Sequence, residues 1–194
     1  MNKHEAWQRI KGNAHLKRAM EVALTGNHKV TVFGNPDNGE NYLKIILGDL
    51  LTFRKPCKCG NFTNFKSLCD CDSNAIVKVR KSNKHRKALL NHIVIKLESP
   101  VYSDFNKVGE NFEHVLSRIS DTTQFTKDNK IYPYISTDAN EILLTAITRL
   151  NLTLCRIERI KEVAKTIALM DYYYIINAWH ISEAIGYQIF DGLV

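Results

Sequence analysis

The clearest sign of a functional site in this chain is a pair of glycines at the spacing of a phosphate-binding loop. Gly34 and Gly39 match the glycines of G-x-x-x-x-G-K-[ST], whose lysine and hydroxyl hold the phosphates and magnesium of a nucleotide. Here Glu40 takes the lysine position and Asn41 the hydroxyl position. Because two unit charges at about 4 Å interact by about 4 kcal/mol at an effective dielectric of about 20, a carboxylate there disfavours a triphosphate. The pattern predicts a phosphate loop without ATP hydrolysis; the alternative is an ordinary tight turn between a strand and a helix.

Four of the five cysteines indicate a metal site. They form two close pairs in the pattern C-x-C-x9-C-x-C, namely Cys57, Cys59, Cys69 and Cys71. The first residues of the chain contain no apolar signal core, so paired cysteines favour a metal over a disulfide. Four thiolates satisfy a tetrahedral structural Zn²⁺, and the alternative is a set of reduced thiols. The fifth cysteine, Cys155, is expected in the core of a helical segment.

A basic run follows the cysteines and supplies a candidate nucleic-acid contact. It contains Lys78, Arg80, Lys81, Lys84, Arg86 and Lys87, in a chain of formal net charge +7. Such a strip suits a phosphate backbone, although a solvated helix face has the same composition. The strip therefore makes nucleic acid a candidate partner without requiring one.

Length and composition predict one domain or two small ones with a real core. The chain has 194 residues, 44% of them hydrophobic. No apolar run reaches the length of a membrane span. We therefore expect a cytoplasmic protein without a membrane partner.

The elements that must position these residues follow from apolar periodicity. The pattern predicts strands over 30–33 and 91–97, a loop over 125–135, and helices over 13–25, 41–52, 138–150, 153–170 and 179–190. Asn13 and Thr153 are the expected caps of their helices. The expected fold class is α/β, or α+β if the sheet is reduced. We divide the chain into residues 1–102, with the zinc loop at 56–72, and a helical part at 103–194.

Several segments together resemble one protein family. Residues 10–23 read I-K-G-N-A-H-L-K-R-A-M-E-V-A, and residues 26–28, 56–60, 69–71, 89–93, 152–168 and 180–185 follow the family in the same order. These segments look like magnesium chelatase-like AAA+ ATPases of the ComM/YifB type. The resemblance implies the remnant of a P-loop AAA+ core with a four-cysteine zinc loop, followed by an α-helical lid domain.

Departures from the family pattern concern the residues that handle ATP. The stretch that carries the acidic Walker B strand is absent, because only residues 52–55 separate the helix after the loop from the cysteines. Lys55 replaces an asparagine, His92 replaces an arginine, and Cys155 replaces another arginine beside Arg156. Loss of one such group costs orders of magnitude in rate. ATP and magnesium are therefore not expected as cofactors, and the chain is not expected to be an enzyme.

Three functions remain open from the sequence. The first is a non-catalytic, zinc-stapled interaction module that binds a protein partner or itself, since missing sheet strands expose edges. The second is a DNA-binding module related to ComM-like helicases. The third is a weak residual ATP binder that uses the backbone donors around Gly34 and Gly39.

Overall fold

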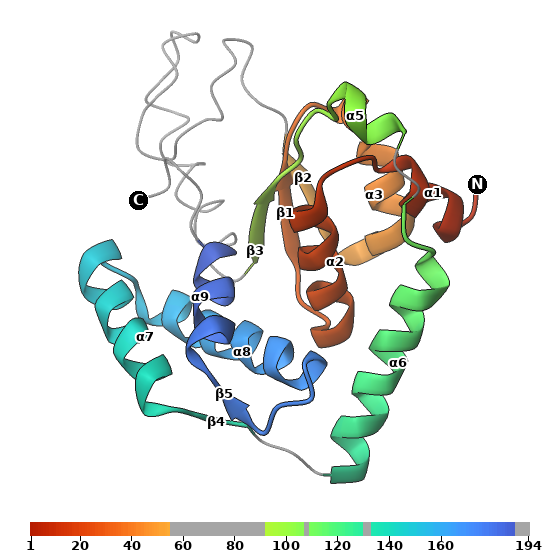
Figure 1. The fold of residues 1–194 in the computed structure, drawn as a ribbon. Helices are drawn as coiled ribbons and strands as arrows, with labels where there is room; N and C mark the ends of the chain where they lie inside the picture. Colours follow the sequence, from red (N-terminus) through yellow and green to blue (C-terminus); the bar gives the residue numbers. More distant parts are fainter. Residues whose placement is uncertain (55–91, 107–108, 130–132, 189–194) are drawn as a thin grey trace, which may run out of the picture.

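The computed structural model describes residues 1–54, 92–106, 109–129 and 133–188 (Figure 1). These residues form a small parallel sheet and a larger set of helices, as expected for a mixed helix and strand fold. None of the helices in these ranges is long and apolar enough to cross a membrane.

The sheet has three parallel strands with the strand before the glycine loop at its centre. β1 (Val30–Phe33) pairs with β2 (Leu51–Arg54) on one side and with β3 (Ile93–Lys96) on the other. All four residues of β1 are buried, whereas those of β2 are half-buried. A central, fully buried strand explains the continuous apolar run of β1, which the sequence predicts with its observed bounds.

The crossover from β1 to β2 differs from the helix expected over 41–52. It consists of η1 (Pro36–Asn38), α3 (Glu40–Leu47) and η2 (Gly48–Leu50). The prediction is wrong beyond Leu47, because the backbone turns at Gly48, which has φ +52°. The residues that follow include threonine and phenylalanine, which suit a sheet, and they form the edge strand β2.

One side of the sheet is covered by helices (Figure 1). They are α1 (Lys3–Arg9), which the sequence did not indicate, α2 (Ala14–Gly26) and α3. α1 begins with a capping box in which Asn2 accepts from the Glu5 N–H at 2.8 Å. α1 contacts α3, while α2 contacts β3, so the sheet has a helical layer on this side.

The segment after β3 contains α5 (Tyr102–Phe105) and α6 (Phe112–Asn129). The loop expected over 125–135 is wrong for 125–129, which continue α6, and for 134–135, which form a short strand. Phe112 and Val115 lie on the buried face of α6, whereas Leu116 is 47% exposed. α6 packs against α1, α2 and α8.

The last part of the chain is helical, with a two-stranded parallel pair. Its elements are β4 (Tyr134–Ile135), α7 (Thr137–Leu150), α8 (Leu154–Met170), β5 (Ile175–Ile176) and α9 (Ala178–Gly186). The helices expected over 138–150 and 153–170 are confirmed to within one residue. α9 ends at Gly186, four residues before the expected end. Thr153 is the N-cap residue of α8, as expected, although its side chain makes no capping hydrogen bond.

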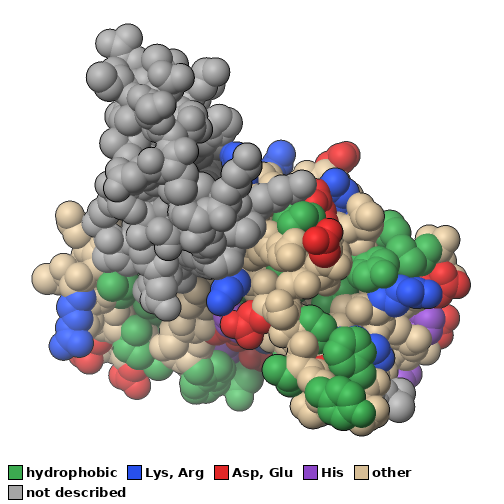
Figure 2. Space-filling view, turned by 90° about the horizontal axis from the view of Figure 1, so that it is seen from above, with side chains coloured by type: hydrophobic (Ala, Val, Ile, Leu, Met, Phe, Trp, Pro, Cys, Tyr) green, Lys and Arg blue, Asp and Glu red, His purple; other side chains and the backbone are tan. Residues whose placement is uncertain are grey.

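One hydrophobic core joins the sheet to the helical part. It extends from Trp7 and Val32 to Ile160 and Ile181, all at most 1% exposed. The outer edge of β3 is also covered, because the Val94 N–H donates to the Tyr187 carbonyl at 2.8 Å. The sheet edge expected to be open is therefore partly covered at β3 by the residue that follows α9. Figure 2 shows that exposed hydrophobic side chains lie in several patches between acidic and basic ones.

Candidate functional site

The first glycine of the candidate loop is needed for packing. Gly34 follows β1 directly, and its N–H donates to the Arg54 carbonyl at 3.1 Å. A Cβ at Gly34 would lie 2.8 Å from Leu97 Cβ and 2.9 Å from the Leu97 carbonyl oxygen. Since one of these atoms is backbone, the contact cannot be relieved by a rotamer change. Gly34 thus lets the segments after β1 and β3 approach each other.

The loop after Gly34 uses its amide donors internally. The Asp37 N–H donates to Asn35 Oδ1 at 3.2 Å, the Asn38 N–H to the Asn35 carbonyl at 3.1 Å, and the Gly39 N–H to the Pro36 carbonyl at 3.1 Å. Gly39 has φ +136°, which favours glycine. A phosphate loop directs successive N–H groups at its ligand. In this conformation three of those donors stabilise η1 instead.

Glu40, at the position of the phosphate-loop lysine, forms an ion pair within its own helix. Glu40 Oε1 lies 2.7 Å from Lys44 Nζ, and the Glu40 side chain is 18% exposed. A carboxylate in the first turn of a helix and a lysine four residues later is the favourable order. The ion pair partly neutralises the Glu40 carboxylate, which is expected from the sequence to repel a triphosphate. Asn41 is exposed.

Three segments meet at the carboxyl ends of the strands. The Asn38 side chain donates to Ser99 Oγ at 2.8 Å. The Asn13 side chain donates to the Glu98 carbonyl at 3.0 Å and accepts from the Glu98 N–H at 2.9 Å. Asn13 therefore does not cap α2 with its side chain, which corrects the expectation, and instead fixes the turn before α2 to the segment after β3.

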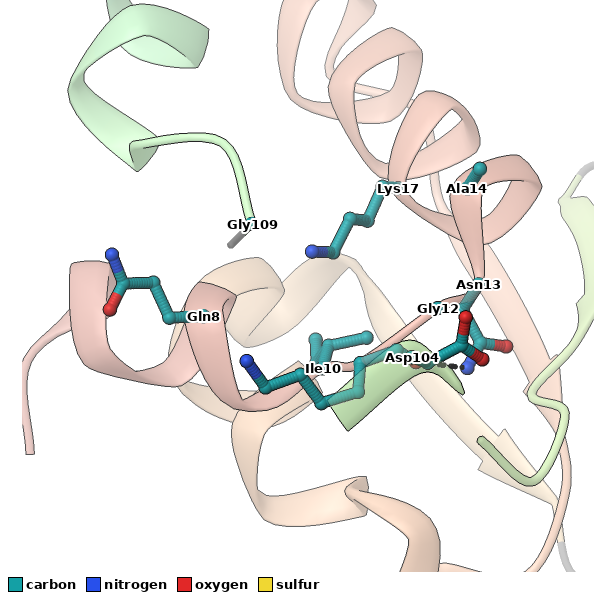
Figure 3. Close-up of a pocket in the computed structure, with 9 residues that line it drawn as sticks. Gln8, Ile10, Gly12, Asn13, Ala14, Lys17, Asp104 and Gly109 are labelled. Atoms are coloured by element: carbon teal, nitrogen blue, oxygen red, sulfur yellow. Dashed lines mark hydrogen bonds between the residues drawn. The ribbon is translucent and has the colours of Figure 1, made fainter. Parts of the chain in front are cut away.

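A pocket of about 400 Å³ lies beside this junction (Figure 3). Residues of α1, the following turn, α2 and α5 line it, namely Gln8, Ile10, Lys11, Gly12, Asn13, Ala14, Lys17, Asp104 and Gly109. In Figure 3 the Asp104 carboxylate lies beside Gly12 and Asn13, the Gln8 amide lies toward the opposite end, and the Lys17 ammonium lies between them. The pocket therefore offers separate cationic and anionic groups.

Lys17 is held in this pocket by an aromatic ring. Its Nζ lies 5.2 Å from the centre of the Trp7 ring, and Trp7 packs on Phe112 with ring centres 5.2 Å apart. Burial, followed by the charge of Lys11, lowers the pKa of Lys17, while Glu110 acts in the opposite direction. The site thus disfavours the charged form of Lys17.

A second polar network lies at the start of β1 and joins it to α8. His28 Nε2 lies 2.8 Å from Thr166 Oγ1, and His28 Nδ1 lies 3.1 Å from an Arg159 nitrogen. Burial and then the charge of Arg159 lower the pKa of His28 to about 4. Nearby, His92 Nδ1 lies 2.8 Å from Thr31 Oγ1. These histidines are therefore neutral parts of the core near neutral pH.

A third network joins α2 to α9 through Arg18. Its guanidinium donates to Glu183 Oε1 at 3.1 Å and to Asp171 Oδ1 at 3.3 Å. His180 Nε2 lies 3.4 Å from the other Asp171 oxygen. All of these groups serve the packing of the helices, and none lines the pocket of Figure 3.

Some candidate residues from the sequence cannot be placed. Cys57, Cys59, Cys69, Cys71 and the basic strip of residues 78–87 lie outside the described residues. Within the described ranges, no three histidine, cysteine or acidic side chains gather as metal ligands. Cys155 is exposed on α8, so the expectation that it lies in the core is wrong.

Lys17 and the histidine network were missed in the sequence. Lys17 occurs within the quoted segment 10–23, but its position over Trp7 depends on α1, which the sequence did not indicate. His28 appears only as part of residues 26–28. No local pattern links it to Arg159, which is 131 residues away.

A family model described as "Magnesium chelatase, subunit ChlI" matches residues 6–54. The matched part is about a quarter of the chain and contains the end of α1 together with α2, β1, the glycine loop, α3 and β2. No curated protein and no solved structure matched the chain. The match supports a relationship to the magnesium chelatase family over these residues.

Proposed function

We propose that this chain is a non-catalytic module derived from the AAA+ ATPases that acts by binding another protein. Its family relationship would be to the ComM/YifB type, with a truncated α/β core and a helical lid. Cys57, Cys59, Cys69 and Cys71 would hold a structural zinc ion, and no step of ATP hydrolysis would take place.

The conformation of the glycine loop carries this proposal. Three amides from Asp37 to Gly39 donate within the loop, and the next residue is Glu40 instead of lysine. Both differences oppose a triphosphate, because they remove donors and place a carboxylate near the anion. The Glu40–Lys44 ion pair reduces the repulsion but also occupies the lysine nearest to the loop on α3.

The surface supports a role in binding. Large apolar residues are well exposed on α5 and on the connection from α8 to α9, for example Tyr102 at 86% and Tyr174 at 54%. Aromatic residues of this kind are enriched in the central contacts of protein interfaces. A module that has lost its chemistry but keeps such surfaces is suited to association.

The test of association uses a complete ComM-like ATPase as the bait. We expect the purified chain to bind it at micromolar concentrations, because a related module would use the surfaces through which such subunits contact one another. No association at those concentrations would count against the proposed function, and so would steady ATP turnover by the chain alone.

DNA binding is the second candidate, favoured by the formal net charge of +7. A phosphate-backbone contact weakens steeply as salt is added, because counterions are released on binding. A salt titration of duplex DNA binding therefore decides this candidate. Absence of binding at low salt would remove it.

A further inference from the structure

We infer that the pocket containing Lys17 and the neighbouring surface of α5 form a docking site for a protein segment that carries a carboxylate next to large apolar side chains. The inference rests on the proposed function, since it names the chemistry of the partner. It concerns Lys17, Gln8 and the exposed residues Val101, Tyr102 and Phe105.

The cationic part of the site is the Lys17 ammonium. Within the described parts of the chain, Lys17 forms no ion pair. Its ammonium instead lies over Trp7, and a Cβ on Gly109 would be 3.7 Å from it. A half-buried ammonium that has given up part of its hydration is stabilised by an anion that enters the pocket.

Glu110, whose charge acts on Lys17, is already bound by Arg118. The Glu110 carboxylate accepts hydrogen bonds from both terminal nitrogens of Arg118, one of them at 3.0 Å. Arg118 Nε also donates to Glu21 at 2.6 Å. Hydrogen bonds from Arg118 lower the pKa of Glu110, so Glu110 remains an anion held by Arg118. It raises the pKa of Lys17 less than Lys11 lowers it.

The apolar part of the site lies on α5, whose Asp104 lines the same pocket. Val101 is 60% exposed, Tyr102 86% and Phe105 58%. The Asp104 carboxylate accepts from the Val101 N–H at 3.1 Å, which caps the first turn of α5 beside the pocket that Asp104 lines. α5 lies at the top of Figure 1, on the face that Figure 2 shows from above.

These two parts together define the chemistry of the partner. A carboxylate side chain would reach Lys17, with the Gln8 amide as a further donor, while leucine or phenylalanine side chains would cover Tyr102 and Phe105. The carboxylate of Asp104 lies at the other end of the pocket, beside Gly12, where it disfavours a second anion. An isolated small anion would leave the apolar surface of α5 uncovered, so the surface favours a protein segment.

Trp7 provides a direct readout because Lys17 lies over its ring. The chain has two tryptophans, so Trp179→Phe leaves Trp7 as the single indole fluorophore. The probe is a short blocked peptide of glutamate, leucine and phenylalanine, and the matched peptide has glutamine in place of each glutamate. We expect a saturable change in Trp7 emission with the acidic peptide, and about tenfold weaker binding of the glutamine peptide.

Matched variants separate the site from general effects. Lys17→Gln and Tyr102→Ala should each weaken binding of the acidic peptide by about tenfold, whereas Lys17→Arg should retain binding. The controls are Lys161→Gln on α8 and Tyr134→Ala on β4, both exposed and outside the pocket. These controls should bind as the parent does. If Lys17→Gln fails to fold, Lys17→Arg and the glutamine peptide still test the charge.

Several results would overturn the inference. Equal binding of the two peptides would do so, as would unchanged binding by a folded Lys17→Gln variant. Saturation of the Trp7 signal by inorganic phosphate or by MgATP would show a small-anion or nucleotide pocket instead. Loss of peptide binding with retained association to a ComM-like ATPase would refute this site and leave the proposed function standing.

Discussion

Glu40 and Lys44 form an ion pair one helical turn apart, with Glu40 Oε1 2.7 Å from Lys44 Nζ. The Glu40 carboxylate occupies the position at which a phosphate loop has its lysine. Here it lies in the first turn of α3 and pairs with a lysine of the same helix. Lys44 is the nearest lysine to the loop on this helix, and it is engaged by a side chain of the same helix. The positive end of the α3 dipole also favours a carboxylate at this position.

The first prediction concerns the strength of this pair. A double-mutant cycle with Glu40→Gln and Lys44→Gln should give a coupling of about 0.5 kcal/mol or less, because the Lys44 side chain is 58% exposed. Urea unfolding at low and high salt measures it. The coupling should decrease in high salt, and a coupling unchanged by salt would argue against a direct charge interaction.

The second prediction is a loss of stability in acid through His28. Its pKa is lowered from 6.5 to about 4 by burial and by Arg159, so the unfolded chain binds this proton at a higher pH than the folded chain. The free energy of unfolding should therefore fall as pH decreases from 6.5 to about 4, by roughly 3 kcal/mol for this group. Burial also lowers the pKa values of His92 and His180, which act in the same direction.

Urea unfolding across this pH range measures the effect. His28→Asn should be less stable near neutral pH but should show a flatter decline in acid. His114→Gln, an exposed histidine on α6, is the control and should keep the parent's slope. An identical slope in His28→Asn would refute the assignment to His28.

The third prediction concerns the link between α2 and α9. Arg18→Met should destabilise the fold by about 1–2 kcal/mol, because Asp171 and Glu183 lose a common cationic partner. The value is limited by partial solvent exposure of all three side chains. Thermal unfolding compares it with Arg149→Met, an exposed residue on α7. An equal loss of stability in the Arg18→Met and Arg149→Met variants would show that the ion pairs of Arg18 contribute no net stability.

The fourth prediction is stoichiometric zinc. Elemental analysis of the purified chain should find one zinc per chain, because four thiolates complete a tetrahedral site. Cys57→Ser with Cys59→Ser should remove the metal and lower stability, since structural zinc contributes folding energy. Cys155→Ser should retain the metal, because Cys155 lies exposed on α8. Metal-free protein with unchanged stability would contradict the zinc site.

Periodicity identified the elements whose apolar pattern is strong. β1, α7 and α8 agree with the expected ranges within a residue, because each has a continuous buried run or a regular apolar stripe. β2 was missed because its four residues directly follow the residues of α3 and η2 and prolong the same apolar pattern. Only its pairing with β1 distinguishes it as a strand.

The candidate site was only partly accessible from sequence. The glycine spacing located the loop, but the internal use of its amides and the Glu40–Lys44 contact depend on the folded backbone. Asn13 occupies the N-cap position of α2 as expected, but its side chain binds the distant backbone of Glu98 instead of the helix. The pocket around Lys17 requires α1, α2 and α5 together, and sequence spacing carries no signal for that arrangement.

Calorimetric titration with MgATP shows whether the glycine loop still binds a nucleotide. We predict no saturable heat for the parent chain, and measurable binding for a Glu40→Lys, Asn41→Thr variant that restores the ammonium and the hydroxyl of a phosphate loop. Saturable MgATP binding by the unaltered chain would contradict the proposal that the glycine loop no longer binds a triphosphate.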